Sequence, residues 1–141
     1  MAKRSATANW SGGLKDGKGR MALGSGAFEG NFSFNTRMGD EPGTNPEELI
    51  GAALAGCFTM ALSATLEKGG HVPEKIETSA KVDFGPDDGG FSIKFIELET
   101  NAKVDGLTDD EFQNIAKEVK AACPVSKALS VRIDLTANLV K

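Results

Sequence analysis

The sequence predicts an α+β domain in which antiparallel sheets wrap around two core helices. Three observations support this: a long apolar stretch from Leu49 to Leu66, a later stretch with one apolar stripe, and several stretches of alternating apolar and polar residues. Along the chain the order is strands, helix, strands, helix, strand, which is typical of α+β proteins. At 141 residues the chain has the length of one domain, residues 1–141.

Short strands open the predicted fold. Ser5–Ser11 and Arg20–Gly24 are extended candidates joined by a turn-rich segment, and Phe28–Phe34 alternates as a third strand. Met38–Gly43 is then predicted as a loop that leads to the first long helix, with Arg37 at its edge. Trp10 is interpreted as a packing residue.

A long helix is predicted to begin at Asn45. Asn45 is a suitable N-cap, Pro46 fits the first helical position, and Glu48 completes a capping box. Apolar or small residues then lie on every side as far as Leu66, so the helix should be buried. Its length approaches that of a membrane span, but glycines and hydroxyl residues interrupt it and favour a core helix. Small residues four apart around Gly51 predict that a second helix crosses here.

A hairpin follows the helix. Ile76–Phe84 alternates as a strand with one buried face, Gly85–Gly90 is the turn, and the return strand runs from Phe91 to Val104. The return strand changes its apolar phase, and one extra residue would restore a single buried face. We therefore predict a β-bulge near Phe95–Ile96.

The second helix has the clearest signals. Thr108 and Glu111 form a capping box, and one apolar stripe runs along the helix and ends at Cys123. Pro124 then predicts the start of a further helix. Val131–Leu139 alternates as the final strand.

Composition excludes several functions. The net charge of −4 argues against a nucleic-acid partner. The N-terminus shows no secretory pattern, and we expect a cytoplasmic protein outside the membrane. The chain has one histidine and two widely separated cysteines, which is not a metal-site spacing. That histidine, His71, follows the long helix and is interpreted as part of a loop or C-cap.

Cys57 has two readings. A lone cysteine in a buried helix is usually a small packing residue. The alternative is a reactive thiolate, and the second cysteine supports it, because the helix that Pro124 begins would favour an anion at Cys123. In a reducing compartment the two cysteines are a redox pair or plain core residues.

Four runs in this order resemble the osmotically inducible protein C (OsmC) branch of the OsmC/Ohr family of thiol peroxidases. They are FNTR (Phe34–Arg37), GTNPEELIGAA (Gly43–Ala53), GCFTMAL (Gly56–Leu62) and CPVSKAL (Cys123–Leu129). The likeness extends to the AxW of Ala8–Trp10 and to the alternating C-terminal strand, so it covers nearly the whole chain.

The resemblance implies an intertwined homodimer with active sites at the subunit interface. It assigns Cys57 as the peroxidatic cysteine, Cys123 as the resolving one, Arg37 as the cation and Glu47 as its partner. The implied reaction reduces organic hydroperoxides, and hydrogen peroxide less well, in oxidative or osmotic stress. It needs no bound cofactor, and its reductant is an external dithiol, commonly a protein-bound dihydrolipoyl group.

Alternatives to these roles stay open. Arg37 is otherwise an exposed arginine, and Glu47 otherwise only complements the helix N-terminus. Ohr-type relatives take their arginine from the N-terminal hairpin, where Arg20 stands, but the presence of FNTR favours Arg37. As a whole, the chain is alternatively a non-catalytic homodimer that binds an apolar small molecule, or a thiol redox sensor.

The motif also contains a geometric conflict. About ten residues separate Glu47 from Cys57, which is ~15 Å along one straight helix. Either the helix breaks between them, or the glutamate or arginine comes from the partner subunit. We predict a break near Gly51, because glycine carries a high cost within a helix.

Overall fold

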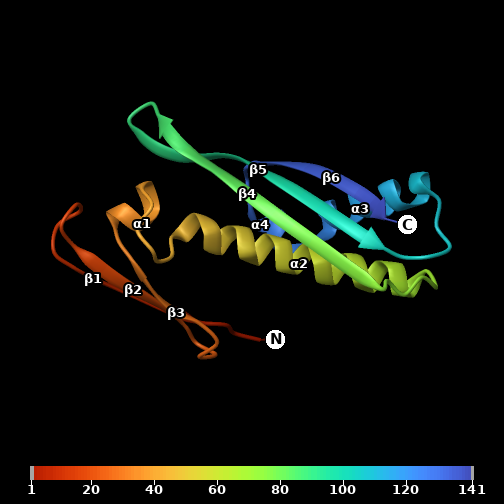
Figure 1. The fold of residues 1–141 in the computed structure, drawn as a ribbon, viewed down its shortest axis with the longest axis horizontal. Coiled ribbons are helices and arrows are strands. Elements are labelled where there is room, and N and C mark those ends of the chain that lie inside the picture. Colours follow the sequence, from red (N-terminus) through yellow and green to blue (C-terminus); the bar gives the residue numbers. More distant parts are fainter. Residues whose placement is uncertain (1, 141) are drawn as a thin grey trace. The chain divides into compact units, whose positions relative to one another are not determined.

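The computed structural model describes residues 2–140 and confirms the α+β class. It divides into two compact units, Met1–Leu49 and Ile50–Lys141, which we describe separately. The first contains β1 (Ala6–Ser11), β2 (Lys18–Leu23), β3 (Glu29–Phe32), α1 (Phe34–Met38) and the start of α2 (Pro46–Lys68). The second contains the rest of α2, β4 (Lys75–Asp87), β5 (Gly90–Lys103), α3 (Asp109–Ala122), α4 (Pro124–Ala128) and β6 (Arg132–Val140) (Figure 1).

The first unit opens with the predicted strands. They form an antiparallel sheet in the order β1-β2-β3. The ring of Trp10 lies 5.3 Å from that of Phe32, which confirms its packing role. Arg20 lies on β2 and pairs with two neighbours on β3, Glu29 at 3.0 Å and Asn31 at 2.6 Å.

Arg37 lies in a short helix rather than at the edge of a loop. Ser33 is the N-cap of α1: its hydroxyl accepts a hydrogen bond from the Thr36 amide, and the Thr36 hydroxyl accepts one from the Ser33 amide. This reciprocal capping box stabilises a helical turn. The alternating pattern of Phe28–Phe34 predicts a strand up to Phe34 instead. Arg37 follows Thr36 directly and takes its direction from this turn.

Helix α2 is continuous, so the predicted break near Gly51 is wrong. The predicted cap is present, with the Asn45 side chain accepting from the Glu48 amide at 2.8 Å. A Cβ on Gly51 would lie 3.4 Å from Val82 and 3.7 Å from Ala80, both on β4. The close approach at Gly51 is therefore to a strand, not to the second helix that we expected, and this packing offsets the cost of a helical glycine.

The second unit contains the predicted hairpin, with strands β4 and β5 paired antiparallel. The register shifts between Asp83 and Phe84, where Asp83 pairs with Phe95 and Phe84 with Ile93. Lys94 is thus the extra residue of the predicted bulge, one position before Phe95. One detail differs from the predicted antiparallel sheet: β6 pairs parallel with β5, because α3 is the crossover between them.

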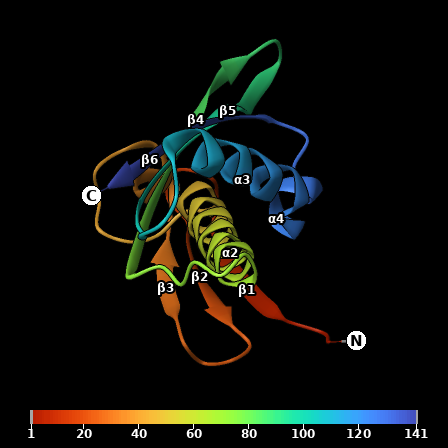
Figure 2. The ribbon, with the colours of Figure 1, turned by 90° about the vertical axis from the view of Figure 1, so that its right-hand side faces the viewer.

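The core of the second unit lies between its helices and its sheet. In Figure 2, α2 is seen nearly end-on with α3 beside it. The buried apolar side chains come from α2, α3, β5 and β6, and those with no exposed surface are Leu54, Phe58, Leu62, Leu66, Ile96, Ala102, Phe112, Ala116 and Cys123. The single stripe predicted for the second helix is the face that enters this core.

Within the described subunit α2 is not buried on every side, in contrast to the prediction. It is long and apolar enough to pass a test for a membrane span, yet only 28% of its most apolar window is buried. One side of α2 packs into the core. The other carries a stripe of small residues and one large one, whose members are Ala52, Ala53, Gly56, Met60 and Ala64.

The end of α2 confirms the role predicted for His71. The His71 amide donates to the Leu66 carbonyl at 2.8 Å, and the Gly70 amide donates to Glu67 at 2.9 Å. This is the Schellman pattern, which needs a left-handed residue after the helix. Gly70 supplies it with a φ of +90°.

We expect Gly70→Ala to lower the free energy of unfolding by about 1–2 kcal/mol, since an L-residue is strained in the left-handed region. Gly69→Ala is the matched control, because Gly69 has no positive φ and its Cβ would meet nothing closer than 3.5 Å. Urea unfolding of both variants measures the difference. Equal stabilities would show that the cap does not depend on Gly70.

Candidate active site

The two cysteines meet in the second unit. The Sγ atoms of Cys57 and Cys123 are 2.8 Å apart and share a hydrogen bond, and both cysteines are free. Cys57 is half-buried, whereas Cys123 has no exposed surface. Of the two cysteines, only Cys57 therefore retains surface in contact with solvent.

The turn between α3 and α4 positions Cys123. Its amide still donates to Val119 as the last bond of α3, but its ψ of 123° is not helical. Pro124 enforces this turn, since the residue before a proline is disfavoured in the helical region. Cys123 thus ends one helix and caps the next, and its sulfur faces Cys57 on α2.

Burial controls the acidity of both thiols. For Cys57, burial and then the hydrogen bond with Cys123 raise the pKa, and the backbone amide of Val125 only partly offsets them. For Cys123, burial also raises the pKa, but the hydrogen bond with Cys57 and the amides of Ser126 and Val125 outweigh it and lower the pKa. Two thiols this close ionise as one coupled pair. The hydrogen bond between the two sulfurs therefore lets them share one negative charge, while burial opposes that charge at both.

The other two predicted site residues meet in the first unit. Arg37 holds Glu47 with both arms of its guanidinium, at 2.9 Å from Nε and 2.8 Å from Nη2. Glu47 is only 8% exposed. Its hydrogen bond raises the pKa of Arg37, so the guanidinium stays charged. A planar, bidentate pair of this kind fixes the direction of the cation as well as its charge.

The structure thus brings together two pairs, Cys57 with Cys123 and Arg37 with Glu47. Because α2 is unbroken, Glu47 lies ~15 Å along the helix axis from Cys57 of the same chain. The Ohr-type alternative, Arg20, is bound by Glu29 and Asn31 in its own sheet. No group of three or more metal-ligating side chains occurs among residues 2–140.

Two residues near these pairs were not singled out from the sequence. Ser126, three positions after Cys123, has a buried hydroxyl, and its side chain, like its amide, helps to lower the pKa of Cys123. Thr36, which precedes Arg37, is buried and hydrogen-bonded. The spacing of Ser33 and Thr36 was the available signal, since serine three residues before a hydrogen-bonding side chain is a capping pattern.

Comparison with known proteins gives consistent matches. The family model described as OsmC-like protein matches residues 39–138. Peroxiredoxin OsmC of Escherichia coli (strain K12) is 44% identical over 133 residues, covering 94% of this chain and 93% of that protein. An organic hydroperoxide resistance protein of Xanthomonas axonopodis pv. citri (strain 306) is 33% identical, covering 69% and 67%. The crystal structure of the organic hydroperoxide resistance protein OhrB of Bacillus subtilis superposes with a TM-score of 0.72 at 27% identity, covering 96% and 98%.

The sulfur contact predicts an easy disulfide within one chain. The two sulfurs need only a small movement to reach the about 2.05 Å of an S–S bond. Mild oxidation should therefore remove both free thiols while the chain still migrates as a monomer on a non-reducing denaturing gel. Thiol titration beside that gel makes the measurement. A covalent dimer as the main product would contradict the geometry.

Proposed function

The chain belongs to the OsmC family, and from this membership we propose that it is a thiol-dependent peroxidase that reduces organic hydroperoxides, and hydrogen peroxide less well, in oxidative or osmotic stress. The observation that carries the proposal is the contact of Cys57 with Cys123, in which the sulfur of a partly exposed residue lies 2.8 Å from the sulfur of a buried one. The partly exposed residue suits the attack on peroxide. The buried residue suits the closure of a disulfide.

The reaction has three steps. The Cys57 thiolate attacks the distal oxygen of the hydroperoxide, the O–O bond breaks, and the alkoxide leaves as an alcohol after taking a proton. Cys57 is now a sulfenic acid, which Cys123 attacks with loss of water to form a disulfide. An external dithiol then reduces that disulfide and is oxidised itself. No bound cofactor takes part, and a protein-bound dihydrolipoyl group is the proposed reductant.

The first step needs a cation beside Cys57. Burial raises the pKa of this thiol within one subunit, and a nearby positive charge is the usual means of lowering it again. Arg37 is proposed as that cation, with Glu47 as the residue that aims it. The same charge stabilises the alkoxide as the O–O bond breaks.

An intertwined homodimer would supply this cation from the partner. The exposed stripe on α2 is apolar, and Met60 within it is 77% exposed. Beside it lies a groove of about 620 Å³ between α2 and the start of β4, lined by Gly56, Met60 and Ile76 among others. Small residues four apart permit close helix packing. The stripe therefore fits a second copy of α2.

The continuous helix supports completion of the site across this interface. Glu47 and Cys57 of one chain are too far apart along α2 for a carboxylate to reach the sulfur. A site at the interface would combine Cys57 and Cys123 of one subunit with Arg37 and Glu47 of the other. Such an arrangement is natural in a symmetric dimer, which forms two equal sites.

Some further proposals complete the assignment. The family match from 39 to 138 runs across the boundary between the two units, which supports one OsmC-like domain. We place the protein in the cytoplasm, because a reducing compartment suits a pair of cysteines that cycles between thiols and disulfide. The net charge of −4 supports the proposal that no nucleic acid is bound.

Steady-state turnover of cumene hydroperoxide with dihydrolipoamide tests the function. Cys57→Ser should abolish peroxide consumption, because it removes the attacking sulfur. Cys123→Ser should still form a Cys57 sulfenic acid, trapped with dimedone, and then stop. If Cys123→Ser alone lost all reaction with peroxide, the two roles would be reversed. A redox sensor would be oxidised without sustained turnover, and a binding protein would lose no thiols.

Arg37→Ala should slow Cys57 oxidation on the order of 10²–10³-fold, by loss of a charge that stabilises the transition state. It should also raise the Cys57 pKa and move the rise of the pH–rate profile to higher pH. Stopped-flow oxidation of both enzymes measures this. Arg20→Ala is the matched control, and a large loss there with none at Arg37 would favour the Ohr-type arrangement.

Mixing two inactive variants tests completion across the interface. Refolded mixtures of Arg37→Ala and Cys57→Ser chains contain heterodimers with one complete site each, so activity should return to about one quarter of the wild-type level. Each variant refolded alone is the control. If all four residues act within one chain, the mixture stays inactive.

A further inference from the structure

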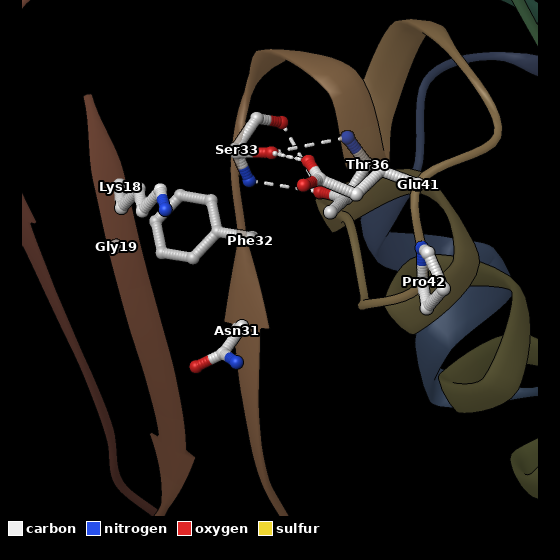
Figure 3. Close-up of a pocket in the computed structure, with 8 residues that line it drawn as sticks. All are labelled: Lys18, Gly19, Asn31, Phe32, Ser33, Thr36, Glu41 and Pro42. Atoms are coloured by element: carbon white, nitrogen blue, oxygen red, sulfur yellow. Dashed lines mark hydrogen bonds between the residues drawn. The ribbon is translucent and has the colours of Figure 1, made fainter. Parts of the chain in front are cut away.

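Thr36 lies at the centre of a buried hydrogen-bond cluster in the first unit, which also contains Ser33, Thr44 and Asn45. Its side chain is 8% exposed. Figure 3 shows Thr36 with Ser33 and Glu41 beside a small hollow of about 190 Å³. Ser33 donates from its hydroxyl to Glu41 at 2.9 Å, which holds the following loop against the start of α1.

The Thr36 hydroxyl joins α1 to the segment just before α2. It lies 2.8 Å from the Thr44 carbonyl and 3.1 Å from the Ser33 carbonyl, and it accepts from the Ser33 amide at 2.8 Å. A hydroxyl has one proton, so the shorter distance assigns its donation to Thr44. The carbonyl of Thr36 accepts from the Asn45 side chain at 3.3 Å. Asn45 in turn caps α2.

The methyl group of Thr36 packs against the loop at Gly43. A Cβ on Gly43 would lie 2.7 Å from Thr36 Cγ2 and 2.7 Å from the Asn31 carbonyl, so the loop passes too close for any side chain there. The Thr44 amide then donates to that Asn31 carbonyl at 2.8 Å. Thr36 therefore fixes the loop by a hydrogen bond on one side and by packing on the other.

Two residues of this cluster are close neighbours in sequence of Arg37 and Glu47. Arg37 follows Thr36 in α1, and Glu47 follows Asn45 by two positions in the first turn of α2. A helix of five residues is too short to be stable alone, so the direction of α1 depends on its tertiary bonds. Besides the Arg37–Glu47 pair itself, two bonds of Thr36 tie α1 to the start of α2: its hydroxyl bonds to Thr44, just before α2, and its carbonyl accepts from the Asn45 cap.

We propose that Thr36 is a positioning residue for the peroxidase reaction: its hydroxyl sets the angle between α1 and α2 at which Arg37 meets Glu47 and points to the reacting sulfur. The proposal rests on the proposed role of Arg37. Thr36 itself touches no reacting atom. Its loss should act only through Arg37, because a misplacement of about 1 Å in a positioning group can cost on the order of 10²-fold in rate.

Thr36→Val tests the proposal, since it keeps the branched shape and removes the hydroxyl. Single-turnover oxidation of Cys57 by cumene hydroperoxide should slow by about 10–100-fold, with the rise of its pH profile moved to higher pH. Thr36→Ser keeps the hydroxyl and should restore most of the rate. Thr44→Val is the matched control: Thr44 is 3% exposed, and its carbonyl, which binds Thr36, stays in place.

A double-mutant cycle separates positioning from general damage. In an Arg37→Ala background, Thr36→Val should cause no further loss of rate if Thr36 acts through Arg37, whereas independent effects would multiply. Multiplying effects would overturn the proposal, as would a Thr36→Val enzyme with the wild-type rate and pH profile. If Arg37→Ala itself keeps the full rate, the proposed function of Arg37 fails instead.

Circular dichroism and gel filtration check that each variant keeps its fold and assembly. Should Thr36→Val not fold, Thr36→Ala removes the hydroxyl with less steric demand and goes through the same cycle. A Thr36→Ser enzyme as slow as Thr36→Val would show that the methyl packing, not the hydroxyl, controls the rate. That result would also overturn the proposal.

Discussion

The contact between the sulfurs of Cys57 and Cys123 constrains the whole second unit. It requires that α3 end where its apolar stripe reaches α2. Pro124 ends the helix there, because the residue before a proline, Cys123, is disfavoured in the helical conformation. The core side chains of α2 and α3 hold the two helices at that separation. The cost of the arrangement is electrostatic, because burial disfavours the thiolate that the chemistry needs.

In the proposed reaction, the two units supply different things. The second unit provides the protected sulfurs, and the first provides a charged guanidinium held by a nearly buried carboxylate. Glu47 does not add positive charge, and its negative charge even weakens the electrostatic field of Arg37. The role proposed for Glu47 is orientation, since a bidentate partner removes the rotational freedom of a long side chain before substrate arrives.

Much of the fold follows from local patterns, and the differences have identifiable causes. The caps at Asn45 and Thr108, the end of α2 at Gly70 and the bulge at Lys94 are each determined by neighbouring residues, so the sequence predicts them. The continuity of α2 at Gly51 is not local, because it depends on contact with a strand far along the chain.

The candidate site divides in the same way. The resemblance to the family proposes Cys57, Cys123, Arg37 and Glu47 as site residues, and in the structure the two cysteines lie together, as do the two charged residues. The helix that carries Arg37 was not predicted, since Ser33 and Thr36 sit within an alternating pattern typical of a strand. Whether Arg37 and Glu47 act on the cysteines of their own subunit or of the partner depends on how two surfaces pack together, and a single sequence does not encode that packing in any local pattern.

The separation of 2.8 Å between the sulfurs also sets the fate of an oxidised enzyme under heavy peroxide load. A sulfenic acid can react in two ways. It condenses with a thiol, or it is oxidised a second time to sulfinic acid, which is irreversible for most proteins. Because Cys123 is already in place, condensation is intramolecular and needs no diffusion, whereas the second oxidation requires another molecule of peroxide. In the proposed cycle, the contact that closes the disulfide thereby also protects the protein from inactivation by its own substrate.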